Sequence, residues 1–132
     1  MSSTDPWRKF GRDFAACIAR LRRPEYTILL ARRDSAPCGF LFLHPNGVAG
    51  SPYIASIVTS AEVRGQGVGS ALLDAAEHWI PGARHIFLCV SSFNTSARRL
   101  YERRGYTQVG EFPDYVVDGF SEILMLKRLV SA

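Results

Sequence analysis

Apolar residues recur along the chain with two different spacings, and these spacings predict its helices and strands. From Val68 to Trp79 the apolar positions lie three or four residues apart, as on one face of an amphipathic helix. From Tyr53 to Ser60 β-branched residues are frequent, which predicts a buried strand directly before that helix. Similar patterns predict further helices over residues 7–21 and 94–104, and further strands over residues 26–31, 38–44, 85–90, 106–112 and 121–129. This order of elements predicts a mixed α/β fold around one sheet.

Glycine, proline and asparagine residues mark the predicted boundaries. Residues 34–37 predict a turn that joins two neighbouring strands as an antiparallel hairpin, and residues 45–52 predict a loop. Asn94 is placed to cap the helix that follows it, and Gly105 is placed to end that helix. No repeat, linker or low-complexity segment divides the 132 residues, so we expect a single domain over residues 1–132.

Three glycines, Gly65, Gly67 and Gly69, lie where the central predicted strand passes into the following helix. The first N–H groups of a helix have no partner within it, and the helix dipole makes that end positive, so an anion is the natural ligand there. Glycine lets a phosphate approach the backbone closely, and Arg64 adds a permanent positive charge. The stretch therefore predicts a pyrophosphate-binding loop.

Two common phosphate-binding loops do not fit this spacing. A nucleoside-triphosphate loop needs a lysine and then Ser or Thr after its last glycine, and Ser70 follows Gly69 with no lysine. The dinucleotide-binding pattern G-x-G-x-x-G needs its third glycine one residue later than Gly69. That pattern also needs an acidic residue about 20 positions on, where this chain has Arg84 and His85.

Two motifs together resemble a known family. Arg64-x-x-Gly67-x-Gly69 is similar to the coenzyme-binding signature of the GNAT superfamily of acetyl-CoA-dependent N-acetyltransferases. Residues 94–106 have the pattern N-x-x-A-x-x-L-Y-E-x-x-G-Y, which resembles the other hallmark of the same superfamily. The resemblance covers residues 26–127. It implies an α/β (α+β) fold with a mixed, largely antiparallel central sheet and helices on both faces.

The chain departs from the family pattern in a shortened N-terminal region. Family members usually begin with a strand and two helices that wall the acceptor cleft, whereas this chain has room for only one long helix before Tyr26. Either the cleft is more open here, or a second subunit completes it, as in the homodimers that are common in this family.

The resemblance implies that acetyl-CoA is the co-substrate. In the family the glycine loop holds the coenzyme pyrophosphate, and the pantetheine arm lies between two strands that splay apart and pairs with the backbone of the first of them. The cofactor-binding residues implied here are Ile57, Val58, Thr59, Arg64, Gly65, Gln66, Gly67, Val68, Gly69, Ser70, Asn94 and Ala97. For Asn94 the alternative is a helix cap alone, and the two roles are compatible.

Tyr101 is the predicted catalytic residue, since its family counterpart points at the coenzyme sulfur. When an amine attacks the thioester, the coenzyme leaves as a thiolate with a pKa near ~8.5. A phenol beside that sulfur can donate a proton as general acid. The alternative is a core tyrosine, because position 101 continues the apolar face of its helix.

The sequence names no clear general base. The position at which many family members carry a glutamate is Cys89 here. Asp114, Asp118 and Glu122 lie around the last loop and are candidates, although such carboxylates usually belong to turns or to the surface. Without a strong base we expect a preference for amines that are largely neutral near pH 7 to 8, such as α-amino groups with a pKa of ~7.7–8.0.

Composition limits the expected partners and cellular location of the protein. Much of the formal charge of +4 lies in arginines that we interpret mainly as solvated helix faces, with attraction of a polyanionic cofactor as the alternative: Arg20, Arg22, Arg23, Arg98, Arg99, Arg103 and Arg104. No aromatic-interleaved basic stripe accompanies them, so nucleic acid is not an expected partner. The three cysteines are widely spaced and show no metal-ligand pattern, which favours free thiols and a cytoplasmic location with no metal. No apolar run approaches ~18 residues and the first residues are polar, so neither a membrane segment nor a signal peptide is expected.

These observations favour an N-acetyltransferase that moves an acetyl group from acetyl-CoA to a primary amine of a small molecule or peptide, by direct attack in a ternary complex. The alternative is a non-catalytic acyl-CoA-binding sensor or regulatory module. The missing base and the shortened N-terminal region support that alternative, whereas Tyr101 argues against it. A longer acyl chain is a third possibility, which depends on the depth of the pocket.

Overall fold

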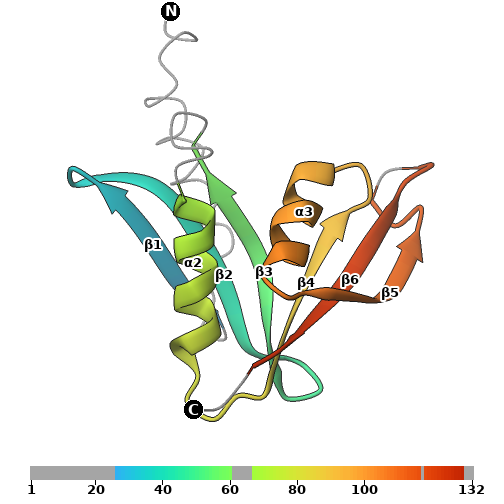
Figure 1. Ribbon diagram of the computed structural model, residues 1–132, viewed down its shortest axis with the longest axis horizontal. Helices are drawn as coiled ribbons and strands as arrows, with labels where there is room; N and C mark the ends of the chain where they lie inside the picture. The colour runs from blue at the N-terminus through green and yellow to red at the C-terminus, as the bar shows by residue number, and fades with distance from the viewer. Residues whose placement is uncertain (1–25, 61–66, 117, 130–132) are drawn as a thin grey trace, which may run out of the picture.

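The computed structural model describes residues 26–60, 67–116 and 118–129. These residues form a six-stranded sheet and two helices (Figure 1). In chain order the elements are β1 (Thr27–Arg33), β2 (Ala36–Val48), β3 (Ser51–Thr59), α2 (Val68–Trp79), β4 (His85–Ser91), α3 (Thr95–Arg103), β5 (Thr107–Pro113) and β6 (Ser121–Arg128). The strand order in the sheet is β1-β2-β3-β4-β6-β5.

The sheet is largely antiparallel, as predicted. Among the described strands, β3 and β4 form the only parallel pair, and α2 is the crossover between them. Their pairing is short, because only Tyr53 with Phe87 and Ile54 with Leu88 are in register. Beyond these pairs the two strands diverge and split the sheet into two wings (Figure 1).

An irregularity in β3 accounts for the divergence. Leu43 of β2 pairs with Ile54, but the preceding residue of β2, Phe42, pairs with Ser56. Ala55 is therefore an extra residue in β3, directly after the last residue that pairs with β4. A bulge of this kind bends its strand and increases the local twist, so β3 turns away from β4 at this point.

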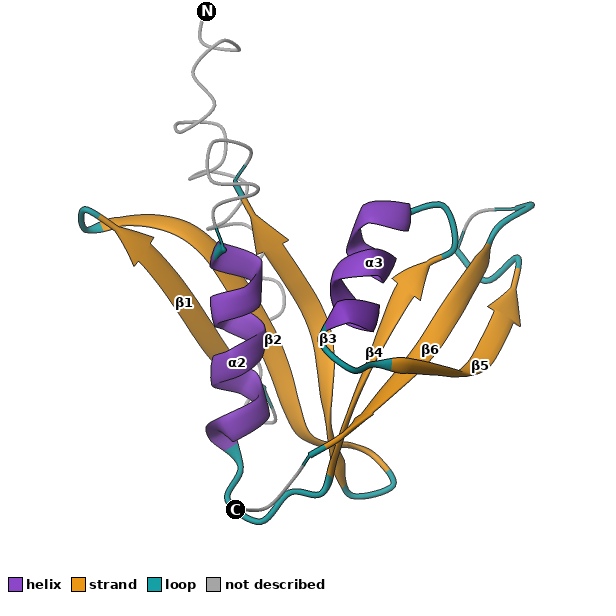
Figure 2. Ribbon diagram, viewed as in Figure 1, coloured by secondary structure: helices purple, strands orange, loops and turns teal. Residues whose placement is uncertain are grey.

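Both described helices pack on one face of the sheet (Figure 2). Helix α2 lies against β1, β2 and β3, and Leu72, Leu73 and Ala76 on its buried face belong to the same apolar cluster as Tyr101 of α3. Apolar residues three or four apart have formed the predicted stripe on α2. The helix predicted over residues 7–21 lies outside the described residues.

The opposite face of the sheet also carries buried aromatic residues. Phe40 and Phe42 of β2 alternate with Gly39 and Leu41, which face α2, so the two phenylalanines point to the other side. They are 2% and 0% exposed, and their ring centroids are 5.1 Å apart. Alternate positions of β2 therefore contribute to both faces, as expected for an interior strand.

A buried carboxylate on α2 forms hydrogen bonds with residues of the wing that contains β4, β6 and β5. Glu77 accepts hydrogen bonds from Arg104 at 3.0 Å, from Tyr106 at 3.0 Å and from Lys127 at 2.8 Å. We call these four residues the Glu77 cluster. Arg104 follows α3 and Lys127 lies on β6, so the cluster joins three elements on the same side of the sheet.

One predicted boundary is wrong. Residues 45–52 do not form a loop. They form the closed end of the β2–β3 hairpin, because β2 continues to Val48 and β3 begins at Ser51. Only Ala49 and Gly50 make the turn, with φ of 48° and 82°. Two residues with positive φ suit the right-handed twist of a hairpin, and the register shift between His44 and Val48 accommodates Pro45.

Candidate active site

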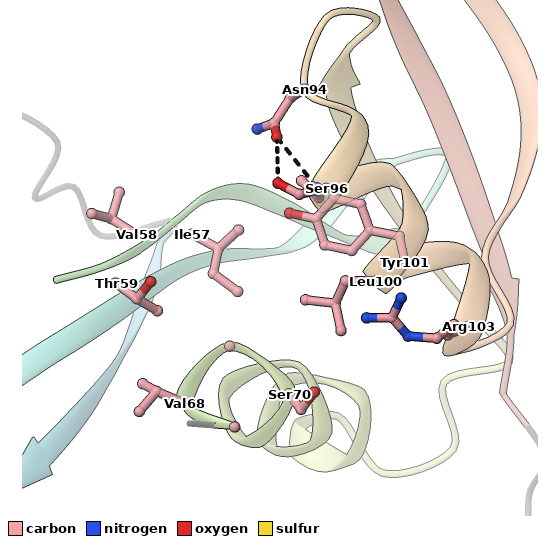
Figure 3. Close-up of a pocket in the computed structure, with 13 residues that line it drawn as sticks. Ile57, Val58, Thr59, Val68, Ser70, Asn94, Ser96, Leu100, Tyr101 and Arg103 are labelled. Carbon is pink, nitrogen blue, oxygen red and sulfur yellow. Dashed lines mark hydrogen bonds between the residues drawn. The ribbon is translucent and has the colours of Figure 1, made fainter. Parts of the chain in front are cut away.

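A groove of about 830 Å³ opens between β3, the N-terminus of α2 and helix α3 (Figure 3). It is lined by Ile57, Val58, Thr59, Gly67, Val68, Gly69, Ser70, Asn94, Ser96, Ala97, Leu100, Tyr101 and Arg103. Every predicted site residue that the structure describes is in this set. The structure thus brings the described part of the predicted site together around one groove, and Arg64, Gly65 and Gln66 lie outside the described residues.

The N-terminus of α2 presents backbone donors to the groove. The first helical hydrogen bond runs from the N–H of Ala71 to the carbonyl of Gly67 at 2.9 Å, so the N–H groups of Val68, Gly69 and Ser70 precede it. No side chain caps this end, where Gly67 has φ of 84°. A left-handed conformation favours glycine. An uncapped helix end of this kind can bind an anion.

The β3 wall presents backbone groups of a different kind. Ile57, Val58 and Thr59 pair with β2 on one edge, but β4 has already diverged from the other edge. Alternate N–H and C=O groups of these residues therefore face the groove without a β4 partner. Such an edge can pair with an extended ligand that contains amides.

Asn94 forms the predicted cap of α3. Its Oδ1 accepts hydrogen bonds from the N–H of Ala97 at 3.2 Å and from the hydroxyl of Ser96 at 3.5 Å (Figure 3). The cap fixes the first turn of α3 beside β3, at the mouth of the split in the sheet.

Tyr101 points from α3 toward β3, with its hydroxyl in the groove near Ile57 (Figure 3). The residue is 6% exposed, and its ring makes an edge contact with Tyr106 at 5.9 Å between centroids. Its hydroxyl has no hydrogen-bond partner among the described residues. Burial raises the pKa of this phenol above its ordinary value, so the group holds its proton at neutral pH.

A smaller cavity of about 200 Å³ continues from Tyr101 between the diverging strands. It shares Ile57, Asn94 and Tyr101 with the groove, and it reaches Cys89 of β4 and Glu122 of β6. Tyr101 is therefore accessible from both spaces.

Polar side chains from β4 and β6, namely Cys89, Ser91 and Glu122, line part of this cavity. Glu122 accepts a hydrogen bond from the hydroxyl of Ser91 at 2.5 Å. Burial raises the pKa of the Cys89 thiol; the nearby Glu122 also raises it, while a hydrogen bond with Tyr53 acts in the opposite direction. Burial likewise raises the pKa of Tyr53, with smaller contributions from Cys89 and Glu122. Both groups are thus neutral at neutral pH.

The three carboxylates that are candidates for the general base differ in their surroundings. Asp114 accepts a hydrogen bond from the N–H of Gly119 at 2.6 Å and is a turn residue, and Asp118 is exposed. Neither lines the cavity, whereas Glu122 does.

Arg103 is exposed, in agreement with our interpretation of the arginines as solvated helix faces. It also lines the groove, as does Leu100 of the same helix (Figure 3). Its spacing from Ser96 and Leu100, at i, i+4 and i+7, identifies the helix face that meets the groove. Arg104 instead belongs to the Glu77 cluster.

Within the described ranges, no group of three or more His, Cys, Asp or Glu side chains is placed to hold a metal ion. In that same part of the chain, no helix has the length and hydropathy needed to cross a membrane.

The sequence pattern that defines the Acetyltransferase (GNAT) family matches residues 2–106. The chain belongs to this family. An uncharacterized N-acetyltransferase of Methanocaldococcus jannaschii is 38% identical over 86 residues, which are 63% of this chain and 55% of the relative. The match thus spans little more than half the length of that curated relative.

Solved structures of acetyltransferases share the fold. Nourseothricin acetyltransferase is similar with a TM-score of 0.74 and 27% identity, over 81% of this chain and 67% of that one. An aminoglycoside 6'-N-acetyltransferase complexed with coenzyme A has a TM-score of 0.75 and 18% identity, over 97% of this chain and 89% of that one.

Proposed function

We propose that this GNAT protein transfers an acetyl group from acetyl-CoA to a primary amine by direct attack in a ternary complex, with Tyr101 as general acid. One observation carries the proposal. The protonated phenol of Tyr101 lies where the groove, which includes the uncapped N-terminus of α2, meets the smaller cavity between the diverging strands. Two reactants can thus reach Tyr101 from two different spaces.

The groove suits the parts of a coenzyme A molecule. The N–H groups at the start of α2 and the guanidinium of Arg103 are suited to hold a pyrophosphate. The free edge of β3 at Ile57, Val58 and Thr59 offers backbone partners to the amides of the pantetheine arm. A Cβ on Gly69 would lie 3.6 Å from Leu100, an ordinary contact, so the protein itself does not require glycine there. A glycine that protein packing does not require is consistent with a phosphate that approaches the backbone at this position.

The residues of the site have separate tasks in the reaction. Acetyl-CoA supplies the thioester. Tyr101 donates its proton to the sulfur as the thiolate leaves, and backbone N–H groups of β3 stabilise the negative charge on the carbonyl oxygen. Holding both reactants beside Tyr101 lowers the entropy cost of their encounter.

The acceptor that we propose is a small molecule or peptide with a primary amine. Three of the similar structures carry antibiotic names, nourseothricin, streptothricin and aminoglycoside. A homodimer and a cytoplasmic location complete the proposal. The alternative, a non-catalytic acyl-CoA-binding module, predicts coenzyme binding without thiol release when an amine library is added.

Replacing Tyr101 with Phe tests the acid role. We expect kcat to fall about 100-fold, because the departing thiolate loses its proton donor. The affinity for coenzyme A, measured by titration calorimetry, should not change. The matched control is Tyr106→Phe, which removes the hydroxyl of the neighbouring ring; its folded fraction should keep normal kcat. An unchanged kcat in Tyr101→Phe would show that the phenol is not the acid.

The pH dependence gives a second check on the same residue. A general acid works while it is protonated, and burial raises the pKa of Tyr101 above its ordinary value of 10.0. The donor is therefore intact below that pH and lost only above it. We expect no decline in kcat on the alkaline side below about pH 10.

A further inference from the structure

Glu122 is the only charged residue among the described residues that line the smaller cavity. It is directly opposite Ser91 in the antiparallel pairing of β4 and β6, and this register brings their side chains together. The hydrogen bond of 2.5 Å from the Ser91 hydroxyl holds one carboxylate oxygen in place. The carboxylate is thus oriented by its neighbour at the far end of the cavity.

Within the described part of the chain, no cation compensates the charge of Glu122. None of the ion pairs formed by described residues includes Glu122. The titratable groups that face it are the neutral Tyr53 of β3 and Cys89 of β4. A partly buried carboxylate is usually paired with a cation. An ammonium group that enters this cavity would supply that cation.

The cavity also connects Glu122 to the reacting atoms. It runs from Glu122 to Tyr101 and Ile57, which also line the groove proposed for the coenzyme. An amine held at Glu122 would therefore approach the thioester from the side opposite the helix end that holds the phosphates.

We propose that Glu122, oriented by Ser91, binds the ammonium group of the acceptor and takes its proton, and that it restricts the acceptor to primary amines without an adjacent carboxylate. This inference rests on the proposed function. The ammonium passes one proton to Glu122, which later releases it to solvent. The nitrogen forms a bond to the thioester carbonyl carbon, and the C–S bond breaks with its electron pair on sulfur. Sulfur takes the proton of Tyr101, and the second proton of the nitrogen restores Tyr101 through water.

The restriction on the acceptor follows from charge. A carboxylate next to the amine would lie close to Glu122, where like charges repel and no described lining residue is a cation. Amino sugars, alkylamines and the N-termini of peptides satisfy this condition, whereas free α-amino acids do not.

An exposed aromatic pair lies near the ends of β4 and β6 and suggests an aromatic probe. Phe93 follows β4 and Phe120 precedes β6, and their rings make an edge contact at 5.2 Å between centroids. They are 53% and 45% exposed, so they offer an apolar surface near the strand ends that carry Ser91 and Glu122. L-phenylalanine amide and L-phenylalanine have the same apolar side chain and differ in the carboxylate.

The test compares kcat/KM for these two probes in the wild-type protein and in Glu122→Gln. We expect the wild type to prefer the amide about 100-fold, and Glu122→Gln to lose about 100-fold with the amide, since general bases contribute factors of this size. The preference for the amide should shrink to within about tenfold in Glu122→Gln, because the repulsion is gone. The KM for acetyl-CoA should not change. A purely structural role of Glu122 would leave the ratio of the two probes as it is.

Glu111→Gln is the matched control. Glu111 lies on the neighbouring strand β5 and also accepts a hydrogen bond from a serine, Ser121, at 2.6 Å, but it does not line the cavity. Its replacement removes the same charge and the same kind of bond, and it should change neither kcat/KM nor the probe ratio. If Glu122→Gln does not fold, Ser91→Ala serves instead, with an expected loss of about tenfold for the amide because the carboxylate is no longer oriented.

The outcomes separate this inference from the proposed function. Equal use of both probes by the wild type, or a Glu122→Gln variant that keeps activity and preference, would overturn the inference. So would a wild-type protein that binds coenzyme A and acetylates neither probe. Failure to bind coenzyme A at all would instead overturn the proposed function.

Discussion

Glu77 and Glu122 are two carboxylates in the same small domain, and they differ in how their hydrogen-bonding capacity is used. Glu77 accepts bonds from Arg104, Tyr106 and Lys127, and its side chain is 4% exposed. Among the described residues, Glu122 accepts one hydrogen bond, from the Ser91 hydroxyl, and it lines a cavity. The first carboxylate is enclosed by its partners, whereas the second still has capacity for a ligand.

The two neighbouring tyrosines show the same difference. Tyr101 and Tyr106 are both nearly inaccessible, at 6% and 1% exposure, and their rings touch. Tyr106 donates its hydroxyl proton to Glu77, whereas the hydroxyl of Tyr101 has no partner within the described chain and lies in the groove. A buried polar group without a protein partner costs stability unless a ligand or water satisfies it. We infer that the Glu77 cluster stabilises the fold, and that the groove and cavity between the diverging strands β3 and β4 hold the reactants.

The largest effect is expected from Glu77→Gln. Arg104 and Lys127 would lose their shared anion while remaining partly buried, at 21% and 22% exposure, so we expect a loss of about 3 kcal/mol in the free energy of unfolding. Denaturant unfolding measures this loss, and kcat of the folded protein should not change. Asp74→Asn is the control. That carboxylate is 65% exposed and 3.7 Å from Arg104, so its replacement should cost less than about 1 kcal/mol.

A loss in kcat comparable to that of Tyr101→Phe would contradict the division of roles. In that case the Glu77 cluster would act on the reaction through the position of α3, and the comparison between the two carboxylates would not separate stability from chemistry.

The next largest effect is the difference between the two tyrosines. Tyr106→Phe removes a hydrogen bond to a charged acceptor, and we expect it to lower the free energy of unfolding by about 2 kcal/mol. Tyr101→Phe removes a hydroxyl with no described partner, and we expect its free energy of unfolding to stay within about 0.5 kcal/mol of the wild-type value. Thermal and denaturant unfolding of both variants give the comparison. Equal losses in the two variants would mean that the Tyr101 hydroxyl is also part of the folded network.

Much of the fold was predictable because its patterns are local. The apolar spacing of α2, the β-branched residues of β3 and the cap at Asn94 are all visible within a few residues. The continuation of β2 past Pro45 was not predictable, because proline locally favours a loop and only pairing with β3 overrides it. The bulge at Ala55 was equally hidden, since no residue there differs from an ordinary strand residue.

The candidate site was predictable where it is carried by contiguous motifs. The glycine positions of α2 and the face of α3 that contains Tyr101 come from two such motifs, and the structure places their described residues around one groove. Glu122 could not be separated from Asp114 and Asp118 by sequence, because its position depends on the register of β4 with β6. Ser91 and Glu122 are 31 residues apart in the chain, and only that pairing brings them together.

The smallest effect, and the one that separates the coenzyme groove from protein packing, is expected from Gly69→Ala. The new Cβ would meet Leu100 at 3.6 Å, an ordinary contact, and alanine is a better helix former than glycine, so stability should stay the same or rise slightly. The methyl group would instead occupy space beside the first N–H groups of α2, where we propose that the pyrophosphate lies. We expect coenzyme A to bind about fivefold more weakly in titration calorimetry, which corresponds to about 1 kcal/mol.

Gly39→Ala is the control, and we expect it to lower stability, in contrast to Gly69→Ala. Its Cβ would lie 3.0 Å from the carbonyl oxygen of Val58 and 3.2 Å from the side chains of Val68 and Leu72, so α2 would be forced away from β2 and stability should fall. Unchanged coenzyme affinity in Gly69→Ala would show that this glycine does not face the phosphates. The N-terminus of α2 would then be an uncapped helix end that contributes to the fold alone, as the Glu77 cluster does.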